Sequence, residues 1–149
     1  MSAPVLDPKT AFPIPVADAD TQPFWDGVGA GELRIQRCAR CNAWLWQPRP
    51  ICSTCQAPAP VWTRVSGDGV IASWVVMRPP TLPAYADKTP FVVLLVELVE
   101  GVRLLGYLVD ESGALLKTDG TTEGVAIGRK VAVRFHDQAG TRLPCWTLS

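Results

Sequence analysis

The sequence predicts a mostly β protein made of three consecutive parts. These are an N-terminal arm with a short helix over residues 1–31, a rubredoxin-like zinc ribbon over 32–62, and a five-stranded OB-fold barrel over 63–149. Three observations lead to this prediction: proline enrichment in the first part, two Cys-x-x-Cys pairs in the second, and short apolar runs separated by turns in the third. A chain of 149 residues is long enough for a small metal module joined to one compact domain.

The first part of the chain reads as an arm followed by a helix. Residues 1–19 contain four prolines and no periodic apolar face, which is typical of an extended segment. A helix start follows at residues 20–25, where Asp20 and Thr21 precede Pro23. Three glycines between positions 27 and 31 keep this helix short. Its aromatic side chain Trp25 needs to be covered, and we expect it to contribute to a partner interface.

The second part has the strands of a small ribbon. Residues 33–37 alternate apolar and polar side chains, as a half-buried strand does, and residues 44–46 supply the return strand before Pro48 and Pro50. Such a ribbon has too little core to fold alone. A structural zinc ion contributes on the order of 10–16 kcal/mol to folding in small zinc fingers. The sequence therefore predicts a module that depends on a metal.

The metal ligands are four cysteines arranged as two pairs, with ten residues between the pairs. They are Cys38, Cys41, Cys52 and Cys55. Two Cys-x-x-Cys turns direct four soft ligands at one centre, which favours zinc, with a single rubredoxin-like iron as the second candidate. Because four protein ligands leave no open position, the ion is expected to be structural and not catalytic. Four unrelated buried cysteines, or two redox pairs, are the alternative interpretations of the same residues.

The third part reads as a barrel of five short strands. Residues 110–128 are polar and irregular, with one short helix expected at 114–117. A central hairpin and an irregular link between the third and fourth strands fit a Greek-key barrel of the OB type better than a sandwich of about seven strands. The expected strands cover residues 70–77, 91–99, 102–109, 129–136 and 141–148.

The composition argues against one common use of OB folds, the binding of single-stranded nucleic acid. Lys+Arg and Asp+Glu each number 14, so the formal net charge is zero. Single-stranded nucleic acid is bound through aromatic stacking in a positively charged groove, and a neutral chain lacks that electrostatic contribution. Six tryptophans keep a single-stranded nucleic-acid-binding OB module as an alternative. The main expectation is that no nucleic acid is bound.

Cysteine usage and hydropathy indicate the compartment. Metal-spaced thiols and a start without a basic segment predict a cytoplasmic protein. The longest apolar stretch, residues 91–96, is too short to span a bilayer, so no membrane association is expected. The fifth cysteine, Cys145, is expected to be a small apolar strand residue.

An ordered series of motifs resembles one known family. It begins with Phe24-Trp25, Gly31-Glu32-Leu33, Arg37-Cys38-x-x-Cys41, Pro48-Arg49, Cys52-x-x-Cys55, Trp62 and Ser66-Gly67-x-Gly69-x-Ile71-x-Ser73. It continues with Arg78-Pro79-Pro80, Pro90-Phe91-Val92-Val93, Val96-Glu97-Leu98 and Glu100-Gly101. The chain resembles the acyl-CoA-associated zinc-ribbon and OB-fold proteins known as domain of unknown function 35, over residues 21–148.

The resemblance implies an accessory subunit. Such proteins accompany thiolase-fold enzymes: thiolases, acyltransferases, 3-hydroxy-3-methylglutaryl-CoA synthases and the lipid-transfer-protein-like aldolases of steroid side-chain breakdown. The implied partner is therefore a thiolase-fold subunit in a hetero-oligomer, with acyl-CoA at the shared interface. This sequence departs from the family pattern at Asn42, which stands where a glycine is usual, and in the longer link over 110–128. Asn tolerates the same left-handed backbone as glycine.

No catalytic constellation is evident from the residues. A hydrolase or transferase needs a nucleophile with a base within reach. The single histidine, His136, ends a predicted strand, and no Gly-x-Ser-x-Gly turn accompanies it. Glu97 interrupts the apolar run from residue 91 and is either the polar face of a buried strand or a carboxylate at an interface. The chain is predicted to have no catalytic residues of its own.

Two surfaces are candidates for binding. Arg34, Arg37 and Arg49 lie near the cysteines in sequence and are candidates to contact the phosphates of CoA, which keeps a stand-alone acyl-CoA-binding protein as an alternative. The loop over 79–90 contains four prolines and is therefore stiff. Leu82 and Tyr85 are expected to be exposed at its tip as anchors for the partner.

Overall fold

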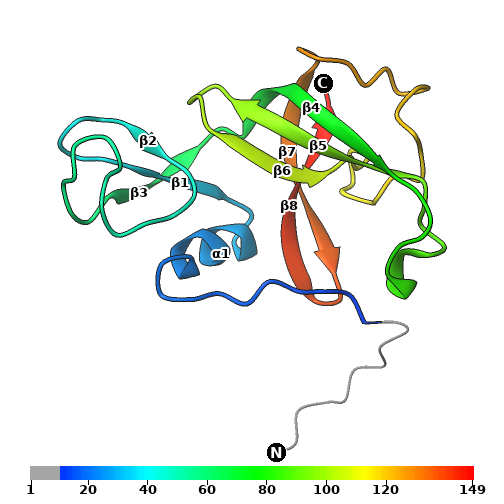
Figure 1. The fold of residues 1–149 in the computed structure, drawn as a ribbon, viewed down its shortest axis with the longest axis horizontal. Helices are drawn as coiled ribbons and strands as arrows, with labels where there is room; N and C mark the ends of the chain where they lie inside the picture. The colour runs from blue at the N-terminus through cyan, green and yellow to red at the C-terminus, as the bar shows by residue number, and fades with distance from the viewer. Residues whose placement is uncertain (1–10) are drawn as a thin grey trace, which may run out of the picture.

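The computed structural model describes residues 11–149 as two antiparallel sheets and one short α-helix (Figure 1). The part of the expected arm that precedes residue 11 lies outside the described residues. A three-stranded sheet has the order β2-β1-β3, and a five-stranded sheet has the order β6-β5-β4-β7-β8. This confirms the mostly β prediction of one short helix, a ribbon and a five-stranded barrel.

The helix α1 covers Gln22–Gly29, with a proline in its first turn as the sequence predicted. The Asp18 carboxylate accepts hydrogen bonds from the backbone N–H and the hydroxyl of Thr21, which fixes the chain just before the helix. Phe24 and Val28 are buried on one face. Gly27 allows close packing, since an added Cβ would lie 2.9 Å from the Arg34 side chain. The helix is therefore packed onto the ribbon.

The ribbon contains β1 (Leu33–Arg37), β2 (Trp44–Leu45) and β3 (Val61–Val65). Strand β1 pairs with β2 through only two residues but with β3 through five. The sequence analysis did not identify β3, whose residues cross the expected division between positions 62 and 63. Strand β3 then continues through Gly67 directly into the first barrel strand.

The barrel contains β4 (Asp68–Met77), β5 (Phe91–Leu98), β6 (Arg103–Tyr107), β7 (Lys130–Gln138) and β8 (Thr141–Leu148). All five predicted strands are present. The sheet closes where Leu108 forms a parallel bridge with Trp146 and the Val109 N–H donates to the Trp146 carbonyl at 2.9 Å. This closure of the first sheet edge onto the last completes the OB-type barrel.

The short helix expected at 114–117 is absent, and that prediction was wrong. The Asp110 carboxylate instead accepts the N–H groups of Ser112 at 2.8 Å and Ala114 at 3.0 Å, which holds the chain in a turn. Gly113 has φ +87°, outside the helical range, and Leu115 bridges Val109. Local side-chain to backbone hydrogen bonds of this kind compete with helix formation.

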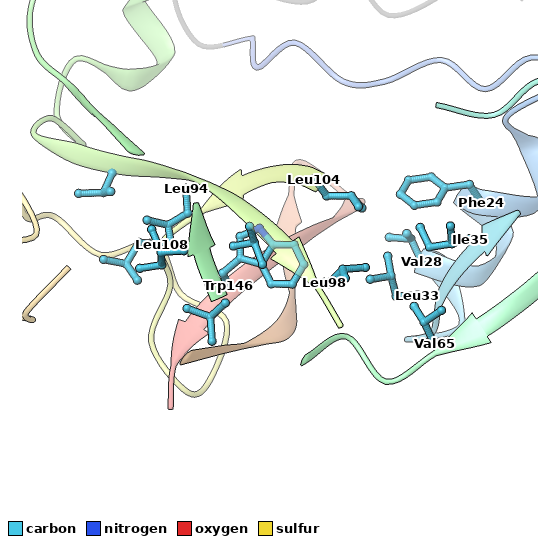
Figure 2. Packing of buried hydrophobic residues seen from close by; sticks show 14 residues of the cluster. Phe24, Val28, Leu33, Ile35, Val65, Leu94, Leu98, Leu104, Leu108 and Trp146 are labelled. Atoms are coloured by element: carbon cyan, nitrogen blue, oxygen red, sulfur yellow. The ribbon is translucent and has the colours of Figure 1, made fainter. Parts of the chain in front are cut away.

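One hydrophobic core joins the helix, the ribbon and the barrel (Figure 2). Phe24 and Val28 of α1 and Ile35 of β1 are buried in the same cluster as Leu104 and Trp146 of the barrel. A separate small cluster contains Leu45 with Cys38 and Cys52. The ribbon was predicted to have too little core to fold alone, and its buried residues Leu33, Ile35 and Val65 belong to the same core cluster as the barrel residues.

Candidate functional site

The four cysteine sulfurs converge at the tip of the ribbon. All four Sγ atoms lie within 4.8 Å of one another. Cys38 and Cys55 are 3.6 Å apart between sulfurs, and Cys41 and Cys52 are 3.7 Å apart. These distances are far longer than the S–S bond of about 2.05 Å in a disulfide. A tetrahedral ion with metal–sulfur bonds of about 2.3 Å requires sulfurs separated by about 3.8 Å, so the arrangement fits a metal centre.

The two Cys-x-x-Cys turns have the same local structure. After the first turn, the Asn42 N–H donates to the Cys38 carbonyl at 2.9 Å; after the second, the Gln56 N–H donates to the Cys52 carbonyl at 3.0 Å. Asn42 and Gln56 have φ of 61° and 62°. The left-handed backbone expected for Asn42 is therefore confirmed. Two equivalent turns placed face to face bring the ligands into one cage.

Backbone donors prepare two of the four sulfurs, those of Cys38 and Cys52, to bind a cation. The Cys55 and Thr54 N–H groups lower the pKa of the Cys52 thiol to about 6, and the Thr54 nitrogen lies 3.4 Å from that sulfur. The N–H of Cys41 likewise lowers the pKa of Cys38. Since the thiolate is the form that binds a metal, these donors favour the metal-bound state. Four sulfur ligands suit zinc or a single iron.

The three candidate arginines have different surroundings. Arg34 forms an ion pair with Glu32 at 2.9 Å and packs along α1. The Arg37 guanidinium lies 5.0 Å from the centre of the Trp44 ring and is exposed. Arg49 is exposed, and its Nε donates to the Gln47 carbonyl at 3.3 Å. Arg34 is already neutralised by a carboxylate, whereas Arg37 and Arg49 form no ion pair within residues 11–149.

The three residues expected at a partner interface differ in their exposure to solvent. Leu82 is 55% exposed, as predicted. Tyr85 is only 6% exposed, so the expectation that it stands at the loop tip was wrong. Residues 83–85 form a turn of 3-10 helix that directs the Tyr85 ring inward, where it packs against Phe91 with ring centroids 5.5 Å apart. Trp25 is half-buried, 5.0 Å from the Phe24 ring.

His136 and Glu97 are both held by structural contacts. The His136 Nδ1 lies 2.8 Å from the Gly113 carbonyl oxygen, so this nitrogen holds the irregular loop. His136 also lines a cavity of about 430 Å³ that contains charges of both signs, including Lys88 and Asp137. The Glu97 carboxylate accepts from Arg103 Nε at 2.7 Å. Glu97 is thus the paired polar residue of a strand face.

A groove missed by the sequence analysis lies between α1, the ribbon and the outer face of β5 and β6. Its volume is about 720 Å³. It is lined by residues from four parts of the fold: Phe24 and Trp25 of α1, Trp46 of the ribbon, Leu95 and Leu105 of β5 and β6, and Leu143, Pro144 and Cys145 of β8. One signal in the sequence pointed to it. Residues 91–96 are apolar without alternation, and a strand with this pattern has apolar surroundings on both faces.

No helix within residues 11–149 is long and apolar enough to cross a bilayer. This agrees with the short apolar runs of the sequence.

Comparison with known families places both parts of the chain. A family model described as the ChsH2 rubredoxin-like zinc ribbon domain matches residues 25–61. A second, described as the ChsH2 C-terminal OB-fold domain, matches residues 62–136. Together the two matches include the cysteines and the first four barrel strands.

Three curated proteins are similar in sequence. The 3-oxo-4,17-pregnadiene-20-carboxyl-CoA hydratase alpha subunit of Mycobacterium tuberculosis is 39% identical over 150 residues, covering 96% of this chain and 40% of that protein. A probable enoyl-CoA hydratase alpha subunit of Thermomonospora curvata is 35% identical over 102 residues, which cover 68% of this chain and 31% of that protein. A DUF35 domain-containing scaffold protein of Methanothermobacter thermautotrophicus is 35% identical over 79 residues, which cover 52% of this chain and 59% of that protein. This chain therefore spans less than two thirds of each relative.

Two solved structures share the fold. A chain of an Ltp2-ChsH2(DUF35) aldolase superposes with a TM-score of 0.77 and 28% identity, covering 91% of this chain and 98% of that one. A DUF35 protein of unknown function from Sulfolobus solfataricus has a TM-score of 0.59 and 14% identity, which shows the shared fold. Matching family models, related sequences and a common architecture agree. The chain belongs to the DUF35 family, in which a rubredoxin-like zinc ribbon precedes an OB-fold domain, as in ChsH2.

Proposed function

We propose that this chain is a non-catalytic accessory subunit that docks on a thiolase-fold enzyme acting on acyl-CoA thioesters, with the aldolases of steroid side-chain degradation as the first class of partner. The observation that carries the proposal is the likeness to the Ltp2-ChsH2(DUF35) aldolase chain, which extends over 98% of that chain. In contrast, the two hydratase alpha subunits have more than half of their length outside the aligned region. The likeness thus covers nearly all of a chain found in an aldolase but less than half of either hydratase subunit.

The proposed metal is zinc in a structural role, with iron as the second candidate. The sulfur spacing of 3.6 and 3.7 Å supports a tetrahedral ion that is closed to substrate by four protein ligands. Cys38, Cys41, Cys52 and Cys55 would hold it. Elemental analysis of the purified chain, with a visible absorption spectrum to detect ferric thiolate, separates the two metals.

Absence of intrinsic catalysis is supported by how the reactive side chains are used. His136 contacts the Gly113 carbonyl, and Cys145 is buried with its pKa raised to about 12 by burial, which keeps the thiol protonated. A protonated, buried thiol is a poor nucleophile. Within residues 11–149, neither group is paired with an acid or base that would activate it.

A second candidate function is a subunit of an enoyl-CoA hydratase, because two relatives carry that name. In either case acyl-CoA is proposed to lie at the interface with the partner, where the exposed Arg37 and Arg49 are available to its phosphates. A stand-alone acyl-CoA carrier would bind the thioester without any partner.

Purification of the tagged chain from its source cells tests the proposal. We expect a thiolase-fold enzyme to co-purify, and we expect its retro-aldol cleavage of a steroid-type acyl-CoA to depend on this chain. Co-purification with a hydratase, with hydration as the dependent activity, would favour the second candidate. Tight acyl-CoA binding by the isolated chain, with no enzyme attached, would favour a carrier. Neither activity is expected from the chain alone.

A further inference from the structure

The outer edge of strand β6 offers unpaired backbone groups to the groove. Leu108 donates to the Val92 carbonyl at 2.9 Å, and Leu98 donates to the Val102 carbonyl at 2.9 Å. In an antiparallel pair, every second residue directs its N–H and C=O to the same neighbour. The even-numbered residues from 102 to 108 therefore bond β5, and Arg103 and Leu105 direct their backbone groups away from it.

No strand of the described chain pairs by backbone hydrogen bonds with that side of β6 along Arg103 and Leu105, although Leu143, Pro144 and Cys145 of β8 line the same groove. Strand β6 is the first strand of its sheet, and β8 reaches it only near the closure at Leu108 and Trp146. The two strands are still close at Gly106, where an added Cβ would lie 2.7 Å from the Pro144 carbonyl oxygen. No further bridge joins the two strands between Gly106 and Arg103, and both strands line the groove along this stretch. An edge strand with free donors and acceptors is a template for another strand.

The side chains around this edge suit an extended apolar segment. Leu105 is 65% exposed and faces Leu95 across the strand pair. The opposite wall is aromatic: the Phe24 ring lies 4.9 Å from Trp46 and 5.0 Å from Trp25. In an added strand, alternate side chains point to opposite faces. The side chains on one face of the added strand would contact the aromatic residues, and the backbone of that strand would pair with β6.

The charges at the groove argue against an anionic ligand. Asp18 and Asp20 line it, and neither forms an ion pair within the described chain. The one arginine in the lining, Arg103, is paired with Glu97 at 2.7 Å. The phosphates of CoA would meet uncompensated carboxylates here, whereas a segment carrying lysine or arginine would be attracted.

We infer that the β6 edge and the adjoining groove bind an extended, apolar segment of the partner enzyme by β-strand addition, with a basic residue of that segment facing Asp18 and Asp20. This inference rests on the proposed function, because it takes the partner to be the acyl-CoA enzyme. Strand addition combines main-chain hydrogen bonds with pockets for alternate side chains. The groove provides both.

The test uses the full chain and the purified partner enzyme. We expect Leu105→Asp to weaken the complex by roughly tenfold or more, as loss of a central apolar anchor does. Leu105→Pro removes the N–H that would pair with an added strand, so a similar loss of affinity is expected. Because proline is tolerated on edge strands, this variant should still fold. Ile127→Asp is the matched control, since Ile127 is 66% exposed and lies outside the groove, and it should bind normally. Metal content and thermal unfolding verify that each variant is folded.

Hydrogen exchange gives a readout that side-chain docking alone would not produce. The Leu105 amide should exchange at least about tenfold more slowly in the complex, because it acquires an acceptor. Asp20→Lys should slow association, most clearly at low salt.

Several outcomes would overturn the inference. Normal binding by both Leu105 variants, or an unchanged Leu105 exchange rate in the complex, would each contradict it while leaving the proposed function intact. Slowed exchange at Leu105 caused by free CoA alone would assign the groove to the ligand. If no acyl-CoA enzyme associates with the chain at all, the proposed function fails, and this inference fails with it.

Discussion

The hydroxyl oxygens of Tyr85 and Tyr107 lie 2.7 Å apart, joining the turn after β4 to strand β6. The Tyr85 hydroxyl also lies 3.3 Å from the Oε1 of the buried Gln138. Phe12 of the N-terminal arm packs edge-on against the Tyr85 ring with centroids 5.1 Å apart. A residue expected at an exposed tip is thus the point where an arm, a loop and two strands meet.

Replacing Tyr85 by phenylalanine should destabilise the fold by about 1 kcal/mol. The ring remains in place, but the hydrogen bond to Tyr107 is lost, and the partly buried Tyr107 hydroxyl loses a partner. Chemical denaturation measures the effect, and Tyr85→Ala should cost about 3 kcal/mol through the cavity that it leaves. Unchanged stability in Tyr85→Ala would contradict the packing described here.

The sequence predicted the parts of the molecule that depend on short-range patterns. The cysteine spacing predicted that the four sulfurs would converge, because two short turns determine where they point. Alternation and turn residues gave the five barrel strands for the same reason. The left-handed residue after Cys41 was also expected, since asparagine takes that conformation at low cost.

Short-range sequence patterns could not predict contacts between segments that are distant in the sequence. Tyr85 is buried because Phe12 and Tyr107, 73 and 22 positions away in sequence, pack around it. The groove likewise arises where Trp25, Trp46 and Leu105 meet across three elements. The helix at 114–117 is absent because the Asp110 side chain holds residues 112–114 in a turn and Leu115 forms a bridge with Val109. These three features depend on tertiary packing or on a specific hydrogen bond, and secondary-structure propensity contains no information on either.

Removing one metal ligand should unfold more than the ribbon. Cys52→Ser is expected to lower the metal content from about one ion per chain to nearly none. Because Phe24, Ile35 and Trp146 belong to one core, the barrel should also melt at a lower temperature. Elemental analysis and calorimetry measure the two effects. Cys145→Ala, which leaves all four ligands in place, should retain the ion. If the barrel of Cys52→Ser melts at the same temperature as that of the wild type, the ribbon and the barrel do not share a core.

Two glycines with the same backbone angle provide a matched pair. Gly67 and Gly128 both have φ +80°. An added Cβ at Gly67 would overlap Val133 Cγ1 and lie 2.8 Å from Val133 Cβ, whereas at Gly128 it would meet nothing within 4 Å. Gly128→Ala should cost about 1 kcal/mol from the left-handed backbone alone. Gly67→Ala should cost about 3 kcal/mol, because overpacking adds to that strain. Equal unfolding free energies for the two variants would contradict this packing at the junction of β3 and β4.

Alkaline pH should destabilise the chain through two acids, the buried Cys145 thiol and the half-buried Tyr107 hydroxyl. Burial raises the pKa of the Cys145 thiol from 9.0 to about 12 and raises that of the Tyr107 hydroxyl above its usual 10.0. Above pH 9 the unfolded chain releases the thiol proton that the folded chain retains. Stability is therefore fully present below pH 9 and falls between pH 9 and 12, by at most about 1.4 kcal/mol per pH unit for one group.

Urea denaturation over this range measures the slope. Cys145→Ala removes one of the two groups and should make the slope shallower. A slope that is the same in this variant and in the wild type would show that Cys145 does not contribute.

Leu82 remains the candidate anchor of the loop over 79–90. Its side chain is 55% exposed, whereas its neighbours Ala84 and Tyr85 are buried, so the loop is held firmly while it presents one apolar group. Leu82→Asp should weaken association with the partner enzyme by roughly tenfold, since an exposed leucine that becomes buried in an interface is replaced by a charge. Metal content and thermal stability should stay unchanged, because Leu82 contributes little to the core of the free chain. Ile127→Asp controls for the added charge. Isothermal titration with the purified partner measures the affinity. An unchanged affinity would exclude this loop from the interface and leave the β6 groove as the surface to map next.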